Sequence, residues 1–115
     1  MHEYSLARAL LNQVEQVFRR EEAVGVRRVD VTIGQFSGVD PDLLRMAFED
    51  LNQQSPFAAV ELLIEKVDLE VRCDRCSTEF QVEQFRFVCP NCECGSVKVL
   101  RGEDMILERV VLEAI

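Results

Sequence analysis

The 115-residue sequence has no tryptophan, one histidine and fewer basic than acidic residues. Thirteen lysines and arginines stand against 21 aspartates and glutamates, which gives a formal net charge of −8. This deficit of basic side chains argues against nonspecific nucleic-acid binding, because such binding depends on neutralising phosphates. No apolar run approaches the ~20 residues that span a bilayer, so we expect no membrane association. With one imidazole and no visible nucleophile–base pair, the chain is not predicted to be an enzyme.

The sequence also lacks a recognisable secretory signal. Its first five residues, Met-His-Glu-Tyr-Ser, are not a basic stretch followed by an apolar run. Paired cysteines without such a signal favour a reducing compartment, so we expect a cytoplasmic location.

The most informative feature is a group of five cysteines, four of which form two Cys-x-x-Cys pairs separated by twelve residues. Two such pairs at this separation are typical of a structural zinc site, because two tight turns bring four thiolates to one point. Iron in a rubredoxin-like site, disulfides and redox thiols are the alternatives. The predicted zinc ligands are Cys73, Cys76, Cys89 and Cys92, with Cys94 as an alternative to Cys92.

Hydrophobic periodicity predicts two helices before the cysteines. Apolar residues recur at helical spacing over residues 6–23, and Ser5 is the predicted N-cap of this helix. A second helix is expected over residues 41–53, where Asp40 precedes a proline suited to the first helical position. Both helices have one apolar face, which predicts that they cover a sheet.

Alternating apolar residues predict core strands near residues 29–33, 60–67 and 105–115, and ribbon strands at 78–82 and 85–88. We therefore predict an α+β fold, in which two helices lie on a small three-stranded mixed sheet and a zinc-ribbon domain is inserted before the last strand. The predicted boundaries are residues 1–68 and 101–115 for the α/β domain and residues 69–100 for the zinc ribbon.

The start of the chain is a second candidate site. The α-amine of Met1, the backbone amide of His2 and its imidazole offer three nitrogens for fused chelate rings, which suit Ni²⁺ or Cu²⁺. Glu3 adds another amide and a carboxylate. A histidine at position two is more often part of a disordered terminus, and Glu3 next to a helix start favours the helix dipole. Asp40 has two interpretations, the N-cap and an additional oxygen ligand for nickel.

Four stretches together resemble the HypA/HybF family of hydrogenase maturation factors. They are the terminal Met-His-Glu, the cysteine pairs, the Ile-Gly-Gln-Phe-Ser loop at residues 33–37 and the Gly-Glu-Asp-Met-Ile-Leu-Glu run at residues 102–108. Residues 44–51 of the predicted second helix are also part of the resemblance. The resemblance covers the whole chain, although Cys94 stands where many members of the family have no thiol.

The resemblance implies a nickel metallochaperone that delivers Ni²⁺ for assembly of [NiFe]-hydrogenase and sometimes urease. It implies nickel at His2 and Glu3 and structural zinc at the paired cysteines. The implied partners are a nickel-handling GTPase and the hydrogenase large subunit, and a homodimer is one option for the assembly.

Two other functions compete with this one. A nucleic-acid-binding zinc ribbon is the main alternative, but its basic residues are interleaved with acidic ones and form no basic stripe. An iron electron carrier on the same cysteines would be coloured and redox-active. The basic residues in question are Arg72, Arg75, Arg86 and Lys98, and the acidic ones are Glu70, Asp74, Glu79, Glu83 and Glu93.

Overall fold

A computed structural model describes residues 2–57 and 60–114 of the chain. The helices of this part are α1 (His2–Arg20) and α2 (Pro41–Asn52). One three-stranded sheet has the order β2-β1-β6, and a second has the order β4-β3-β5. The strands are β1 (Gly25–Gly34), β2 (Glu61–Val67), β3 (Glu70–Cys73), β4 (Glu79–Gln81), β5 (Val97–Arg101) and β6 (Met105–Glu113).

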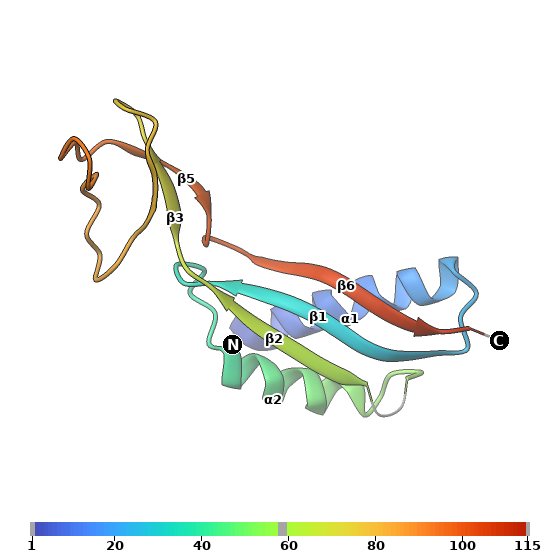
Figure 1. The fold of residues 1–115 in the computed structure, drawn as a ribbon. Coiled ribbons are helices and arrows are strands. Elements are labelled where there is room, and N and C mark those ends of the chain that lie inside the picture. The colour runs from blue at the N-terminus through green and yellow to red at the C-terminus, as the bar shows by residue number, and fades with distance from the viewer. Residues whose placement is uncertain (1, 58–59, 115) are drawn as a thin grey trace. The chain divides into compact units, whose positions relative to one another are not determined.

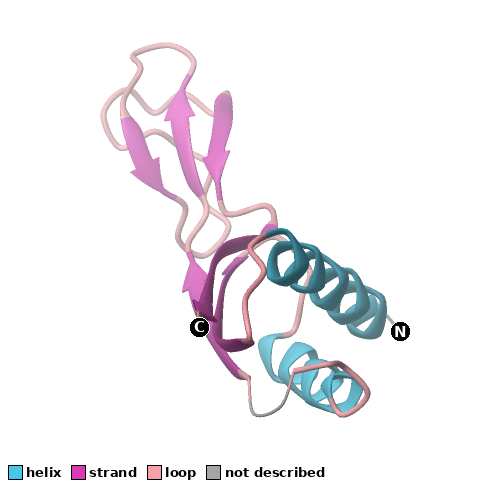
Figure 2. Ribbon diagram, turned by 90° about the vertical axis from the view of Figure 1, so that its right-hand side faces the viewer, coloured by secondary structure: helices cyan, strands magenta, loops and turns pink. Residues whose placement is uncertain are grey.

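The first sheet is mixed and carries both helices on the same face (Figures 1 and 2). β1 and β2 run in the same direction and β6 runs in the opposite one (Figure 1). Parallel neighbours need a crossover connection, and α2 supplies it between β1 and β2. The predicted last strand rejoins this sheet, so the α+β prediction with an inserted cysteine-rich segment is confirmed.

The core of this layer lies between the helices and the central strand. Leu10 and Val14 of α1 and Phe48 of α2 are almost fully buried, as are alternate residues of β1. Each such side chain contributes about 1.5–3 kcal/mol through removal from water. The buried apolar side chains of β1 are Val26, Val29, Val31 and Ile33, and those of the helices include Ala7, Leu11, Leu44 and Ala47.

The first helix differs from the prediction at both ends. It begins at His2 rather than after Ser5, so the predicted Ser5 cap is wrong. It ends at Arg20, because Glu22 adopts a left-handed backbone conformation with a φ of 52°. β1 then begins at Gly25. No helix among the described residues is both long and apolar enough to cross a membrane.

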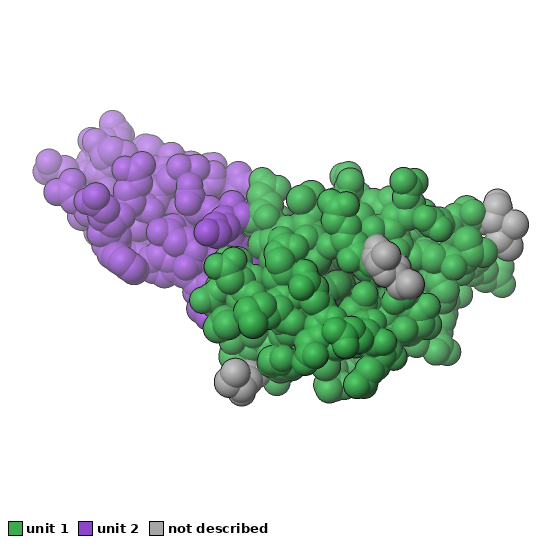
Figure 3. Space-filling view, turned by 90° about the horizontal axis from the view of Figure 1, so that it is seen from below, with its two compact units in different colours: residues 1–32, 39–65, 106–115 green, residues 33–38, 66–105 purple. Residues whose placement is uncertain are grey.

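The chain divides into two compact units (Figure 3). The first unit comprises residues 1–32, 39–65 and 106–115, and the second comprises residues 33–38 and 66–105. The loop 33–38 thus groups with the cysteine-rich segment. The predicted domain boundaries, residues 1–68 and 101–115 for the α/β domain and residues 69–100 for the zinc ribbon, stay a prediction.

The second unit is built on β3, which pairs antiparallel with β4 and with β5. Its small core contains Leu69, Val71 and Val82, with Phe36 and Phe87 among the partly buried residues packed against them. The predicted strand at residues 85–88 is not formed, because Gln84 and Phe85 have φ values of 53° and 60°, which an extended ladder does not accommodate.

Candidate metal centres

Four cysteine sulfurs of the second unit converge on one point. The Sγ atoms of Cys73, Cys76, Cys89 and Cys92 all lie within 4.8 Å of one another, and we call this group the four-sulfur cluster. Cys73 Sγ is 3.5 Å from Cys92 Sγ, and Cys76 Sγ is 3.5 Å from Cys89 Sγ. A tetrahedron with Zn–S bonds of about 2.3 Å has edges of about 3.8 Å. The donor set and its spacing therefore fit a tetrahedral metal ion.

Each Cys-x-x-Cys pair forms the same turn. The amide two residues after the first cysteine donates to its sulfur at 3.4 Å, from Arg75 to Cys73 and from Asn91 to Cys89. The amide four residues after that cysteine donates to its carbonyl, from Ser77 at 3.0 Å and from Glu93 at 2.9 Å. Ser77 and Glu93 both have positive φ, 63° and 61°. The two turns are thus equivalent, which is how one sequence pattern used twice aims four sulfurs inward.

The metal-free cluster holds its protons unequally. The Thr78 hydroxyl, 3.1 Å from Cys76 Sγ, and then the Asn91 side chain lower the pKa of Cys76 to about 5. The Cys94 amide is the largest single influence on Cys92 and lowers its pKa, but burial and the neighbouring thiols outweigh it and raise the pKa to about 12. A divalent cation would stabilise the thiolate forms and displace the remaining protons.

The fifth cysteine lies outside the four-sulfur cluster. The Cys94 carbonyl accepts a hydrogen bond from the Cys89 amide at 3.0 Å, and its Sγ accepts one from the Ser96 amide at 3.5 Å. All five cysteines are free thiols. Cys94 therefore belongs to the turn that follows the second cysteine pair, and its backbone helps to hold that pair.

At the other candidate site, His2 and Glu3 form the start of α1 in the first unit. The His2 side chain is exposed, and the Glu3 side chain is half-buried. Their backbone amides are among the first four of the helix and have no carbonyl acceptor within it. The α-amine of Met1, the third predicted donor, lies outside the described residues.

The loop before α2 lies next to this terminus. The Asp40 amide donates to Glu3 Oε2 at 3.3 Å. Asp40 Oδ1 accepts hydrogen bonds from the Asp42 amide at 2.9 Å and the Leu43 amide at 3.2 Å. The prediction that Asp40 caps α2 is confirmed, and its role as a nickel ligand stays a prediction.

Three residues that support these sites escaped the sequence analysis. The Tyr4 hydroxyl donates to Asp50 Oδ2 at 2.9 Å and connects the first turn of α1 to α2. Thr78 contacts Cys76 within the four-sulfur cluster. No local pattern identifies the Tyr4–Asp50 pair, since the residues lie 46 positions apart. The position of Thr78, two residues beyond a Cys-x-x-Cys pair, was a usable signal.

Two arginines of the second unit, Arg72 and Arg101, are paired with nearby carboxylates. Arg72 forms an ion pair with Glu79 at 2.7 Å, and Arg101 forms one with Glu70. These pairs reduce the positive charge offered to a phosphate backbone, which weakens the nucleic-acid alternative.

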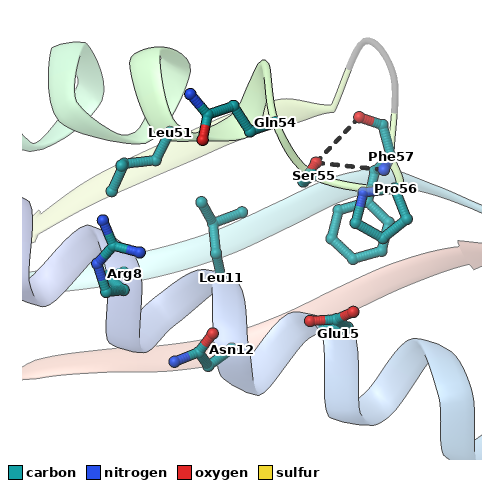
Figure 4. A pocket seen from close by; sticks show the side chains of 9 residues that line it. All are labelled: Arg8, Leu11, Asn12, Glu15, Leu51, Gln54, Ser55, Pro56 and Phe57. Carbon is teal, nitrogen blue, oxygen red and sulfur yellow. Dashed lines mark hydrogen bonds between the residues drawn. The ribbon is translucent and has the colours of Figure 1, made fainter.

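A pocket of the first unit lies between α1 and α2, and its lining residues include none of the predicted ligands (Figure 4). Its Ser55 hydroxyl donates to the Phe57 carbonyl at 3.1 Å and accepts from the Phe57 amide at 3.2 Å. The Ser55 hydroxyl therefore stabilises the turn that follows α2. The lining residues are Arg8, Leu11, Asn12, Glu15, Leu51, Gln54, Ser55, Pro56 and Phe57.

The fold and the four-sulfur cluster define a class of metal-binding protein, in which an α/β layer is joined to a small unit with four clustered cysteines. Residues 1–112 match the family model described as hydrogenase/urease nickel incorporation, metallochaperone, HypA. The chain therefore belongs to the HypA family of nickel metallochaperones, which confirms the resemblance and places it among maturation factors rather than enzymes.

Individual relatives agree over nearly the full length. The chain is 38% identical over 113 residues to the hydrogenase maturation factor HypA of Shewanella baltica (strain OS185), covering 98% of this chain and 97% of that one. It is 35% identical over 113 residues to HypA of Aquifex aeolicus (strain VF5), covering 98% of both chains. Its fold is similar to the solution structure of the Ni metallochaperone HypA from Helicobacter pylori, with a TM-score of 0.73, 29% identity and 98% of both chains covered.

Proposed function

We propose that the chain carries Ni²⁺ on its N-terminal segment through the Met1 α-amine, His2 and Glu3, and delivers it during [NiFe]-hydrogenase maturation. The observation that carries this proposal is that the only imidazole of the chain is exposed at the start of α1, in a family that incorporates nickel. Nitrogen donors in a contiguous segment suit Ni²⁺. An exposed site formed by so few side chains also allows the ion to be released.

We further propose that the four-sulfur cluster holds zinc in a structural role. Four soft thiolates leave no open position, which is typical of structural rather than catalytic zinc. When bound, zinc would supply the positive charge that keeps all four thiols deprotonated. The backbone amides of Arg75 and Asn91 already donate to two of these sulfurs and orient them.

The remaining parts of the proposal concern partners and location. We assign the chain to the cytoplasm, with a nickel-handling GTPase as the source or co-carrier of nickel and the hydrogenase large subunit as the recipient. Support comes from the family's role in hydrogenase and urease nickel incorporation. A homodimer is an option that sedimentation of the purified protein would test.

Metal analysis of untagged protein, after exposure to nickel and zinc followed by dialysis, tests both ions at once. Wild-type protein is expected to retain nickel and zinc, and His2→Ala is expected to retain zinc alone. Metal ligands must be deprotonated to bind, so nickel affinity should fall as the pH is lowered. Unchanged nickel binding in His2→Ala would place the nickel site elsewhere. A coloured, redox-active protein would indicate iron on the cysteines.

A further inference from the structure

Two hydrogen bonds attach the first turn of α1 to α2 and its preceding loop. Glu3 Oε2 accepts from the Asp40 amide at 3.3 Å, just before α2 begins. The Tyr4 hydroxyl donates to Asp50 Oδ2 at 2.9 Å, near the end of α2. These two contacts therefore restrain the segment that carries the proposed nickel donors at positions 2 and 3.

We infer that Tyr4 is a positioning residue for nickel, because its hydrogen bond to Asp50 holds His2 and Glu3 in the place where they bind the ion beside the Asp40 loop. This inference rests on the proposed function. Tyr4 itself does not touch the metal in this scheme.

The geometry explains why the contact has an orienting effect. A helix rises about 1.5 Å per residue, so ten residues of α2 separate the two attachment points by about 15 Å. Two contacts this far apart therefore restrain the direction of the first turn of α1 more than either contact alone. A chelating segment that is already oriented loses less conformational freedom when it binds.

The contact contributes little to the core of the first unit. The Tyr4 side chain is 39% exposed, and the contact to Asp50 is on the surface. Without it, the start of a terminal helix is expected to fray, as unattached chain ends do. Removing the hydroxyl should therefore affect nickel more than overall folding.

The test compares nickel affinity, measured by calorimetric titration of untagged zinc-loaded protein against a competing chelator. Tyr4→Phe and Asp50→Ala are each expected to weaken nickel binding roughly two- to tenfold, the range expected for one hydrogen bond. The double variant should be no weaker than either single variant, because both remove the same contact. Asp50→Asn keeps an acceptor oxygen and should bind close to wild type.

Ser5→Ala is the matched control, because it removes another exposed hydroxyl from the same turn. It should leave nickel affinity unchanged. The melting temperature and zinc content of every variant should stay near those of wild type, and the visible absorption of bound nickel should change only in the variants that lose the contact.

Additive losses, equal affinity in Tyr4→Phe and wild type, or tighter binding in Tyr4→Phe would overturn the inference. His2→Ala separates this failure from a failure of the proposed function. If His2→Ala loses nickel while Tyr4→Phe binds like wild type, only the positioning role is wrong. If His2→Ala binds nickel normally, the proposed site itself is wrong.

Discussion

The carboxylate of Glu3 accepts a hydrogen bond from the backbone amide of Asp40, 37 residues away in the sequence. Asp40 in turn uses its own carboxylate to cap α2. One residue therefore connects the proposed nickel segment to the start of a helix. Its two predicted roles, cap and nickel ligand, can be separated only by a substitution that removes one and keeps the other.

Asp40→Asn is that substitution. Asparagine caps helices about as well as aspartate, so the free energy of unfolding should stay within a few tenths of a kcal/mol of wild type. Asp40→Ala should lower it by about 0.5–2 kcal/mol. If the carboxylate is a nickel ligand, both variants lose nickel affinity by calorimetric titration. Equal affinity in Asp40→Asn and wild type would leave Asp40 as a cap alone.

Thr78→Val is expected to raise the pKa of Cys76 above about 5 in the zinc-free protein, because the Thr78 hydroxyl is the main cause of the lowered value. Because the pKa of Cys76 is lower in the folded chain than the ordinary thiol value of 9.0, its thiolate stabilises the zinc-free fold. This stabilisation is fully present above pH 9.0 and is lost as the pH falls through about 5. Thiolate absorbance followed against pH measures the change.

The consequence for zinc appears at mildly acidic pH. Protons compete more strongly with zinc for a thiol of higher pKa. Both proteins should therefore lose zinc affinity between about pH 8 and about pH 6, and the loss should be larger in Thr78→Val than in wild type. Thr78→Ser keeps a hydroxyl and serves as the control. An identical titration midpoint in Thr78→Val and wild type would contradict the assignment.

Much of the fold followed from local patterns, and the errors have physical causes. The alternation in β1 and the Asp-Pro start of α2 were sufficient because burial and capping act over a few residues. The prediction placed the start of α1 too late in the sequence. Tyr4 and Glu3 belong to its first turn, and they contact Asp50 and Asp40, which are far along the chain. Such contacts leave no periodicity in the sequence.

In the cysteine-rich segment, too, one prediction was correct and another was wrong. The spacing of the paired cysteines identified the four residues that converge, because two equivalent tight turns follow from that pattern. The Phe-Arg-Phe-Val sequence at residues 85–88 has the alternation of a strand and led to the wrong prediction there. Left-handed backbone at Gln84 and Phe85 excludes the ladder there, and Phe36 packs against Phe85 instead, with ring centres 5.3 Å apart.

Loss of a clustered thiol should unfold the second unit and leave the first folded. The core around Leu69, Val71 and Val82 contributes about 1.5–3 kcal/mol per buried side chain, against about 1–2 kcal/mol for every residue ordered. Cys92→Ser should therefore lose zinc and show rapid amide exchange in β3 and β5, with the helices protected.

Cys94→Ser is the matched control, because Cys94 lies outside the four-sulfur cluster. It should retain one zinc ion and wild-type amide exchange. If Cys92→Ser also retained zinc, Cys94 would have taken its place, as the sequence allows. The same exchange experiment on chelator-treated wild type reports whether residues 33–38 lose protection together with the cysteine-rich segment.

Gly34→Ala should destabilise the second unit by about 1–3 kcal/mol, the usual cost of forcing extra volume into a packed site. A Cβ at Gly34 would lie 2.3 Å from the carbonyl carbon and oxygen of Gly102, and backbone atoms cannot move aside as a flexible side chain can. This close approach lets the Phe36 amide donate to the Gly102 carbonyl at 2.8 Å. Gly95→Ala is the control, since its nearest neighbour would be the Phe87 carbonyl oxygen at 3.8 Å. Urea denaturation of the zinc-loaded proteins should separate the two variants, and equal midpoints would show that the Gly34–Gly102 contact is not required.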